Sequence, residues 1–392
     1  MKINKLSFKD CLKEWQFDDF EFNRLTLMVG ASGVGKTRIL QSILQIAKIA
    51  KGESINGINF SIEFSVNQRN SYRWICEFES VEASIFEMQT QLNDSKNKPQ
   101  FKISKEQIWY NSELIIDRTP KNILFRNQPI VKLAMEQSIV ALLKEEKEIK
   151  PIYEAFKKIQ TLRNTEDFGI SLDLLMILSD KEKYIKKLKT LKKIRNFQGP
   201  IQLKLYCASV LQDTSIFDSI KTQFIEVFPN VEDIKVAPIQ KLPSNFPRFF
   251  EDFPFIQIKE KGVKQWITQD AISSGMLKTL IYLSELALCP DNAIFLVDEF
   301  ENSLGVNCIG SLTDSIMETT RNIQFIITSH HPYIINNIPI QDWKLVTRIG
   351  GHVYEHNCNQ LELGKSKHDA FMQLIQLDAF TSGTISKTET IE

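Results

Sequence analysis

The sequence of 392 residues has no long apolar run. No stretch reaches the roughly 18 uninterrupted apolar residues of a membrane-spanning helix, and residues 1–15, MKINKLSFKDCLKEW, lack the apolar core of a signal peptide. Net charge is absent as well, because 48 basic residues balance 48 acidic ones. Overall charge therefore gives no attraction to nucleic acid or to a membrane surface, so any basic surface must be local. We expect a cytoplasmic protein without a membrane contact.

Paired cysteines and seven-residue repeats are also missing. The six cysteines are far apart and form no CxxC pair: Cys11, Cys76, Cys207, Cys289, Cys308 and Cys358. This spacing is typical of free thiols in a reducing compartment and gives no disulfide framework. His352, His356 and Cys358 stand close together but match no zinc-ligand spacing. Without sustained heptads, a long coiled coil is excluded.

What the sequence does contain begins with a phosphate loop. Residues 25–29, LTLMV, predict a buried strand, and the apolar spacing after the loop predicts a helix. Between them Gly30, Gly35, Lys36 and Thr37 fit the pattern G-x-x-x-x-G-K-[ST]. Glycines let backbone N–H groups surround phosphates, the lysine reaches the β- and γ-phosphates, and the threonine hydroxyl binds Mg²⁺. We assign nucleotide contacts to the whole loop and the residue after it: Gly30, Ala31, Ser32, Gly33, Val34, Gly35, Lys36, Thr37 and Arg38.

Two further strand-like runs end in polar side chains. Residues 293–297, AIFLV, precede Asp298 and Glu299. Ligands of open α/β sheets bind at the carboxyl ends of strands, so Asp298 is expected to hold Mg²⁺ and Glu299 to act as the general base toward the attacking water. The run IQFIIT leads to His330, which can donate to a γ-phosphate and report which nucleotide is bound. The alternative for His330 is a strand-end histidine that caps a loop.

Together these stretches resemble the ABC-type ATPases of the SMC-like and OLD-like group, which includes AAA-type ATPases of anti-phage and DNA-maintenance systems. GASGVGKT resembles their Walker A motif, AIFLVDEFE their Walker B motif with its catalytic glutamate, and ITSHHP their switch-histidine loop. The resemblance covers roughly residues 1–60 and 265–360. It implies an α/β P-loop NTPase fold of the ABC-ATPase head type, a mixed sheet with helices on both sides, and ATP and Mg²⁺ as cofactors.

The stretch AISSGMLKTL, residues 271–280, stands where that family has its signature motif. In the family two heads meet head to tail, and each ATP lies between the loop of one head and the signature motif of the other. The resemblance therefore places Ser273 and Gly275 on the partner's γ-phosphate and implies a homodimer or a higher homo-oligomer. Taken alone, the stretch predicts a helix cap. Ser274 and Met276 depart from the common LSGGQ form, and Met276 cannot make the polar contact of the glutamine.

The family pattern suggests two more contacts. Glu301 and Asn302, directly after the carboxylate pair, become candidates for contacts across the dimer. A glutamine is expected to couple Mg²⁺ to the inserted part of the chain. Gln137 is assigned to this role, with Gln128 as the competing choice.

The two halves of the predicted head lie far apart in the sequence, so an insertion must separate them. Residues 55–80 and 103–118 alternate as antiparallel strands do, residues 238–254 hold four prolines, and residues 255–270 predict a hairpin. Nothing in the chain resembles the nuclease module of OLD-like enzymes, so we expect the ATPase to lack its own effector. The predicted segments are the N-terminal half of the head, 1–54; a β-rich lobe, 55–128; a helical insertion, 129–254; the C-terminal half of the head, 255–362; and a C-terminal helix and tail, 363–392.

One segment is locally basic. Residues 180–197 hold seven lysines and Arg195 against two acidic residues. Apolar residues at every third position predict a helix that covers the core with one side, and the lysines would then form its solvated side. The alternative is a surface along Lys181–Arg195 that contacts the phosphates of DNA or RNA, or an acidic partner.

Three functions remain open from the sequence. The first is an ATP-hydrolysing dimeric sensor or scaffold that controls a separately encoded effector, a nuclease or toxin, in phage defence. The second is an SMC-like ATPase that binds DNA in repair or maintenance. The third is a nucleotide-gated interaction protein that restrains a toxin without hydrolysis, which Met276 favours.

Overall fold

The computed structural model describes residues 1–67, 70–82, 99–162, 181–238, 254–361, 364 and 366–384. Contacts divide the chain into two units. The first unit contains Met1–Thr161, Asn292–Phe300 and Arg321–Glu392, and the second contains Leu162–Asp291 and Glu301–Thr320. Most of the proline-rich stretch at 238–254 and part of the predicted helical insertion lie outside the described residues.

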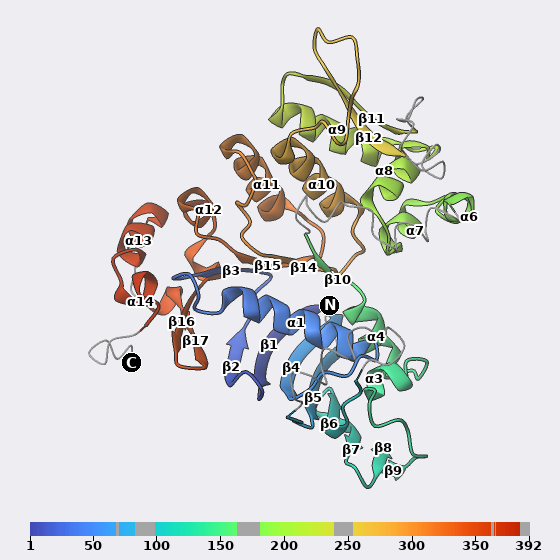
Figure 1. Cartoon of the computed structure of the whole chain (residues 1–392), viewed down its shortest axis with the longest axis vertical. Helices are drawn as coiled ribbons and strands as arrows, with labels where there is room; N and C mark the ends of the chain where they lie inside the picture. The colour runs from blue at the N-terminus through green and yellow to red at the C-terminus, as the bar shows by residue number, and fades with distance from the viewer. Residues whose placement is uncertain are drawn as a thin grey trace. The chain divides into compact units, whose positions relative to one another are not determined.

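A fourteen-stranded mixed sheet forms the first unit, in the order β10-β14-β15-β3-β16-β17-β2-β1-β4-β5-β6-β7-β8-β9 (Figure 1). The strands are β1 (Lys2–Asp10), β2 (Trp15–Glu21), β3 (Leu25–Val29), β4 (Ile58–Asn67), β5 (Asn70–Phe78), β6 (Ile103–Tyr110), β7 (Glu113–Arg118), β8 (Ile123–Phe125), β9 (Gln128–Pro129), β10 (Ile159–Thr161), β14 (Ile294–Val297), β15 (Gln324–Thr328), β16 (Trp343–Ile349) and β17 (His352–Asn357). The predicted α/β class with a mixed sheet is confirmed.

The parallel part of this sheet positions the candidate site. Strands β10, β14, β15, β3 and β16 pair in parallel. Every residue of β3, β14 and β15 is buried, as expected for strands covered on both faces. Because parallel strands end at the same edge, the residues after β3, β14 and β15 meet there although they come from distant parts of the sequence.

The antiparallel part continues the same sheet. Strand β4 pairs with β1 along nearly its whole length, and β5 to β9 follow as successive antiparallel neighbours. The strands predicted for residues 55–128 therefore extend the sheet that carries the phosphate loop. The division of the chain into five segments stays a prediction.

Helix α1 (Lys36–Ala50) follows β3 directly, and its buried apolar residues recur at helical spacing, including Ile39, Ile43, Ile46 and Ala50. It packs on β15 and on two short helices, α3 (Ile139–Leu142) and α4 (Lys150–Phe156). The unit also contains α12 (Pro332–Asn337), η3 (Ile340–Asp342), η4 (Cys358–Gln360), α13 (Lys367–Leu374) and α14 (Asp378–Thr381).

The second unit is built around α10 (Ser274–Leu288), which packs on α7, α8, α9 and α11. The other helices among its described residues are α6 (Lys181–Lys187), α7 (Leu191–Asn196), α8 (Ile201–Ser209), α9 (Ser215–Val227) and α11 (Val306–Glu318). A small antiparallel sheet is formed by β11 (Val231–Ala237), β12 (Phe255–Glu260) and β13 (Ile267–Thr268), so the predicted hairpin is present. Across the described parts of both units, no helix is long and apolar enough to cross a membrane.

Candidate nucleotide site

The phosphate loop is shaped by glycines that tolerate close contact and positive φ. Gly30 has φ +134, and a Cβ there would lie 2.5 Å from the carbonyl oxygen of Val346 on β16. Gly35, with φ +113, is the N-cap residue of α1. A glycine is needed at both positions because other residues rarely adopt these angles. The loop therefore leads the chain from the buried strand directly into the N-terminus of α1, where the helix dipole favours an anion.

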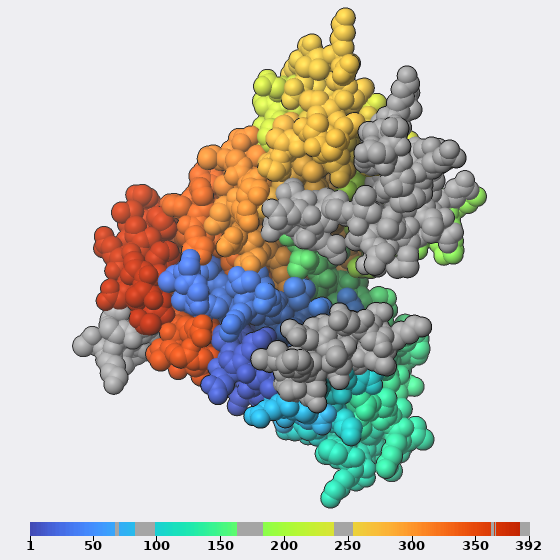
Figure 2. Space-filling view, viewed as in Figure 1, coloured from blue at the N-terminus to red at the C-terminus, as the bar shows by residue number. Residues whose placement is uncertain are grey.

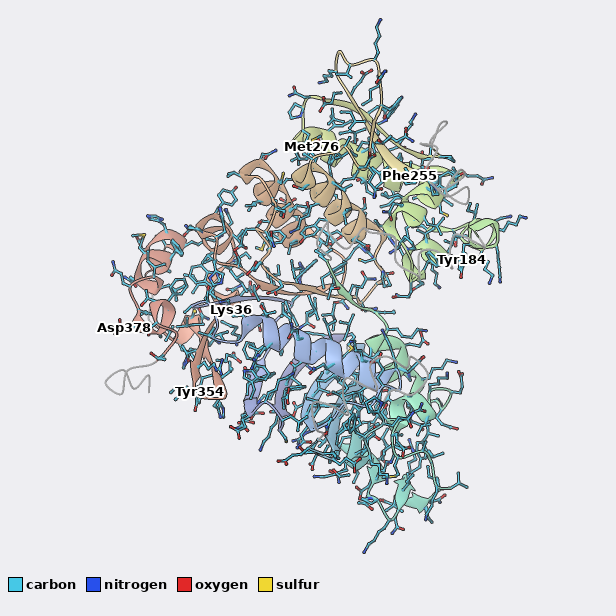
Figure 3. The ribbon with its side chains drawn as sticks, viewed as in Figure 1. Lys36, Tyr184, Phe255, Met276, Tyr354 and Asp378 are labelled. Atoms are coloured by element: carbon cyan, nitrogen blue, oxygen red, sulfur yellow. The ribbon has the colours of Figure 1, made fainter. Side chains whose placement is uncertain are left out.

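A pocket of about 430 Å³ opens beside this loop, within the first unit. Such a volume is within the range of small-molecule sites. Figure 3 labels Lys36, the first residue of α1, at this place in the fold. The residues that line the pocket come from the loop, α1 and three strand ends: Ser32, Gly33, Gly35, Lys36, Thr37, Arg38, Gln41, Asp298, Glu299, Thr328, His330 and Arg348.

Thr37 and Asp298, the predicted Mg²⁺ ligands, are in direct contact. Thr37 Oγ1 donates a hydrogen bond to Asp298 Oδ1 at 3.1 Å. Thr328 Oγ1 donates to the same carboxylate oxygen at 2.7 Å. Two hydroxyls and one exposed carboxylate thus form a cluster of oxygen atoms, and Mg²⁺ prefers oxygen ligands.

Glu299 stands beside this cluster on an unusual backbone. Its φ is +46, a region that residues other than glycine rarely adopt and that is often found at functional sites. Its N–H donates to Thr328 Oγ1 at 2.8 Å, and the next N–H, of Phe300, donates to the Thr328 carbonyl at 3.0 Å. The side chain is exposed and lines the pocket. Thr328 therefore holds both carboxylate residues in place.

Lys36 is only 6% exposed and lies inside the loop. Its ammonium donates to the carbonyl oxygens of Gly30 and Ala31, each at 2.8 Å. The positive charge therefore lies inside the loop, and two of its partners are neutral carbonyl oxygens. Phosphate oxygens make stronger, charge-assisted hydrogen bonds to an ammonium than carbonyl oxygens do.

The two adjacent histidines have different positions. His331 is the N-cap residue of α12, where its Nδ1 accepts a hydrogen bond from the N–H of Tyr333 at 3.2 Å. His330 is exposed and lines the pocket. The geometry thus favours His330 for a contact with a phosphate, because His331 is committed to the helix cap.

The glutamine assigned to Mg²⁺ does not lie at the pocket, and that assignment is corrected. A Cβ at Gly52 would lie 3.8 Å from the side-chain amide of Gln137, so Gln137 sits beyond the C-terminal end of α1. Helix α1 has 15 residues, so its length separates Gln137 from Thr37 by roughly 20 Å. Buried Arg118 holds this segment, since its guanidinium donates to the Gln137 carbonyl at 2.8 Å. Gln128, the competing choice, lies in β9 at the far edge of the sheet.

Three pocket residues were not predicted from the sequence. Gln41 lies one helical turn after Thr37, so the i, i+4 spacing could have indicated it. Thr328 ends the run IQFIIT, and a hydroxyl at the end of a buried strand was the available signal. Arg348 on β16 had no local signal, because only the pairing of β16 with β3 brings it to the loop. Its Nη1 lies 3.5 Å from the Gly33 carbonyl oxygen.

The signature-like stretch belongs to the second unit. Ser273 is the N-cap residue of α10, and its Oγ accepts from the N–H of Met276 at 3.4 Å. Gly275 packs on the loop after the carboxylate pair, since a Cβ there would lie 3.3 Å from the Ser303 carbonyl oxygen. In the same loop, the Asn302 carbonyl accepts from the buried ammonium of Lys278.

Ser273 and Ser274 are exposed at the start of α10. Ser273 is thus a helix cap in this chain, and its side chain is also accessible to a second chain.

Burial raises the pKa of the Tyr282 phenol, and the nearby charge of Glu301 raises it further. The roles predicted for Ser273, Gly275, Glu301 and Asn302 in a dimer stay predictions.

A family model described as "AAA domain, putative AbiEii toxin, Type IV TA system" matches residues 214–336, less than half of the chain. None of the curated proteins matches the chain. A solved structure described as "Crystal structure of the SmcHead bound to the C-winged helix domain of ScpA" is similar at 16% identity and a TM-score of 0.47, over 91% of this chain and 98% of that chain. The SMC head domain from Thermotoga maritima is similar at 12% identity and a TM-score of 0.42, over 91% and 99%. The stretch that carries Ser273, Asp298, Glu299 and His330 is therefore similar to AAA domains, and the phosphate loop lies outside the match.

Proposed function

We propose that the chain binds ATP with Mg²⁺ in the pocket beside the phosphate loop and hydrolyses it. The observation that supports this most directly is the hydrogen bond between Thr37 Oγ1 and Asp298 Oδ1. It joins the loop to the carboxylate pair, although the two residues are far apart in the sequence. The hydroxyl and carboxylate oxygens fit Mg²⁺, which would be held by Thr37 and Asp298 and would neutralise phosphate charge when bound.

The chain's own residues would then act on bound ATP as follows. The ammonium of Lys36 exchanges its two carbonyl partners for phosphate oxygens and stabilises the charge of the transition state. The carboxylate of Glu299 accepts the proton of the attacking water, from a backbone that Thr328 fixes. His330 donates a hydrogen bond to the γ-phosphate.

Replacement of Lys36 by Ala tests nucleotide binding. We expect ATP affinity to fall by about 10- to 100-fold, because a charge-assisted hydrogen bond to a phosphate is removed. The measurement is a titration with a fluorescent ATP analogue. The matched control is Lys48→Ala, which removes an exposed lysine from the other end of α1 and is expected to bind as the wild type does. Equal affinity of the Lys36 variant and the wild type would contradict the proposal.

The biological role that we propose is a homodimeric or higher homo-oligomeric sensor or scaffold, active in phage defence through a separately encoded nuclease or toxin. The resemblance of the loop, carboxylate and signature stretches to ATPases of anti-phage systems supports this role. The neighbouring reading frames test it most simply. A nuclease or toxin gene beside this one supports effector control, and its absence from every genome that carries the gene argues against it.

A second candidate function is nucleic-acid binding through α6 and α7. From residue 183 to 196 the chain carries no acidic residue, and its lysines are all exposed: Lys183, Lys186, Lys187, Lys189, Lys192 and Lys193. Leu188 and Ile194 are buried on the other side, so the two helices cover the core and present a basic surface at once. That surface suits a row of phosphates.

Neutralising four of these lysines tests the second candidate. We expect binding to duplex DNA at low salt to weaken, and the log–log salt slope to become shallower by about 0.9 for each phosphate that a lysine no longer neutralises. Fluorescence anisotropy with labelled DNA measures both. The variant carries Gln at Lys186, Lys187, Lys192 and Lys193, and the control carries Gln at four exposed lysines of the first unit: Lys121, Lys132, Lys144 and Lys147. Unchanged binding, or no binding by the wild type, removes this candidate.

A further inference from the structure

The turn at residues 382–384 packs directly against the phosphate loop. A Cβ at Gly383 would lie 2.4 Å from Val34 Cγ1 and 3.2 Å from Ala31 Cβ. Contacts of a Cβ below 3.0 Å are essentially never seen, so a side chain at this position forces the Val34 side chain, the loop or the turn to shift. Gly383 is buried and has φ +73. Figure 2 shows the red C-terminal residues beside the blue N-terminal part of the chain.

The contact between Gly383 and the loop can affect bound phosphates through the position of Val34. Within the loop, Ser32 and Gly33 are exposed, whereas Val34 is 5% exposed and belongs to the hydrophobic core. The flanking residues Gly33 and Gly35 have no side chains that could anchor the loop, and their backbone is conformationally free. Val34 therefore anchors the outer part of the loop, and a shift of Val34 moves the backbone N–H groups on either side of it.

The turn itself is firmly held, so a clash would be relieved at the loop. The Gly383 carbonyl accepts from the N–H of Arg348 at 2.8 Å. Ser382 Oγ donates to the Asp378 carbonyl at 2.7 Å and accepts from the N–H of Thr384 at 3.3 Å. Helix α14, which precedes the turn, packs on β16 and buries Ala379.

Arg348 connects the same turn to the pocket. Its N–H holds Gly383, while its side chain donates from Nε to the Gly350 carbonyl at 2.6 Å and places Nη1 3.5 Å from the Gly33 carbonyl oxygen. Arg348 also lines the pocket. The C-terminal turn and the exposed tip of the loop are thus bound to one residue of β16.

We propose that the turn 382–384 is a positioning element of the phosphate loop, with Gly383 as the residue that sets nucleotide affinity by leaving room for Val34. This inference rests on the proposed binding of ATP in the loop. The turn packs on the buried side chain of Val34 and needs no contact with the nucleotide. It affects how well the N–H groups of the loop are placed, so it changes the affinity for ATP more than the turnover at saturating ATP.

Replacement of Gly383 by Ala is the first part of the test. We expect affinity for a fluorescent ATP analogue to fall about tenfold, since overpacking at a fixed contact forces the loop to shift. The apparent KM for ATP rises accordingly, and kcat at saturating ATP changes less. Gly262→Ala is the matched control, because Gly262 has φ +77 and nothing within 4 Å of a Cβ. It carries the same backbone strain without the contact.

Replacement of Val34 by Ala completes the test, because it removes Val34 Cγ1, the atom nearest to the new Cβ. Val34→Ala alone is expected to bind the analogue a few-fold more weakly than the wild type, because the side chain that anchors the loop is shorter. The double variant Gly383→Ala, Val34→Ala is expected to bind it as well as Val34→Ala alone does. Melting temperatures check that each variant is folded. Should Gly383→Ala not fold, the weaker binding of the folded Val34→Ala variant still tests the anchor.

Three results would overturn the inference: affinity of Gly383→Ala equal to that of Gly262→Ala, a weakened affinity that Val34→Ala does not relieve, or wild-type affinity of Val34→Ala alone. The failure of the proposed function looks different. In that case the wild type binds the analogue no better than Lys36→Ala does.

Discussion

Glu299→Gln is expected to lower steady-state ATP hydrolysis by roughly 10²–10⁴-fold while ATP affinity stays close to that of the wild type. The amide has the size of the carboxylate but cannot take a proton from the attacking water. The backbone that positions the side chain is unaffected, because the N–H of residue 299 still donates to Thr328 Oγ1. Phosphate release in steady state, together with nucleotide titration, measures the two quantities separately.

The matched control for this change is Glu14→Gln. Glu14 is also exposed and also has a positive φ, +47 against +46 for Glu299, but it does not line the pocket. It is expected to hydrolyse ATP as the wild type does. Normal turnover in Glu299→Gln would contradict the assignment of the general base. A wild-type rate no higher than that of Glu299→Gln would instead favour the non-hydrolysing, nucleotide-gated function.

The sequence predicts the centre of the site well because its signals are local. The glycine spacing and the apolar runs LTLMV and AIFLV each specify a strand and the turn after it within a few residues. The contact between Thr37 and Asp298 then follows from one general rule, that parallel strands end at a shared edge. No knowledge of the intervening chain is needed for that step.

Contacts set by distant pairing could not be predicted in this way. The assignment of Gln137 rests on the family resemblance, but the buried guanidinium of Arg118 holds the Gln137 backbone near the far end of α1. Arg348 reaches the loop only because β16 lies beside β3. The contact of Gly383 with Val34 joins two segments whose sequences carry no sign of each other. Each of these depends on tertiary packing, which local periodicity does not encode.

Ser273→Arg is expected to keep ATP binding but to abolish nucleotide-dependent dimerisation and hydrolysis. In the proposed head-to-tail dimer Ser273 faces the partner's γ-phosphate, and an arginine there blocks the close approach of α10. Within one chain the change is mild, because loss of the cap costs about 1 kcal/mol. Ser366→Arg is the matched control, since Ser366 is likewise an exposed N-cap serine, of α13, and its variant is expected to hydrolyse ATP normally. Light scattering with ATP measures the dimer.

Mixing two inactive variants decides whether Ser273 acts in trans or only as a cap. A heterodimer of Lys36→Ala and Ser273→Arg chains has one site with both changes and one site with neither. The heterodimer closes on ATP at its unchanged site, whereas neither homodimer has such a site. The mixture is therefore expected to regain hydrolysis that neither variant shows alone, up to about half of the wild-type rate, because each heterodimer has one intact site of two. A site contained in a single chain gives no such recovery. Absence of activity in the mixture, with heterodimers present, would return Ser273 to the role of a helix cap.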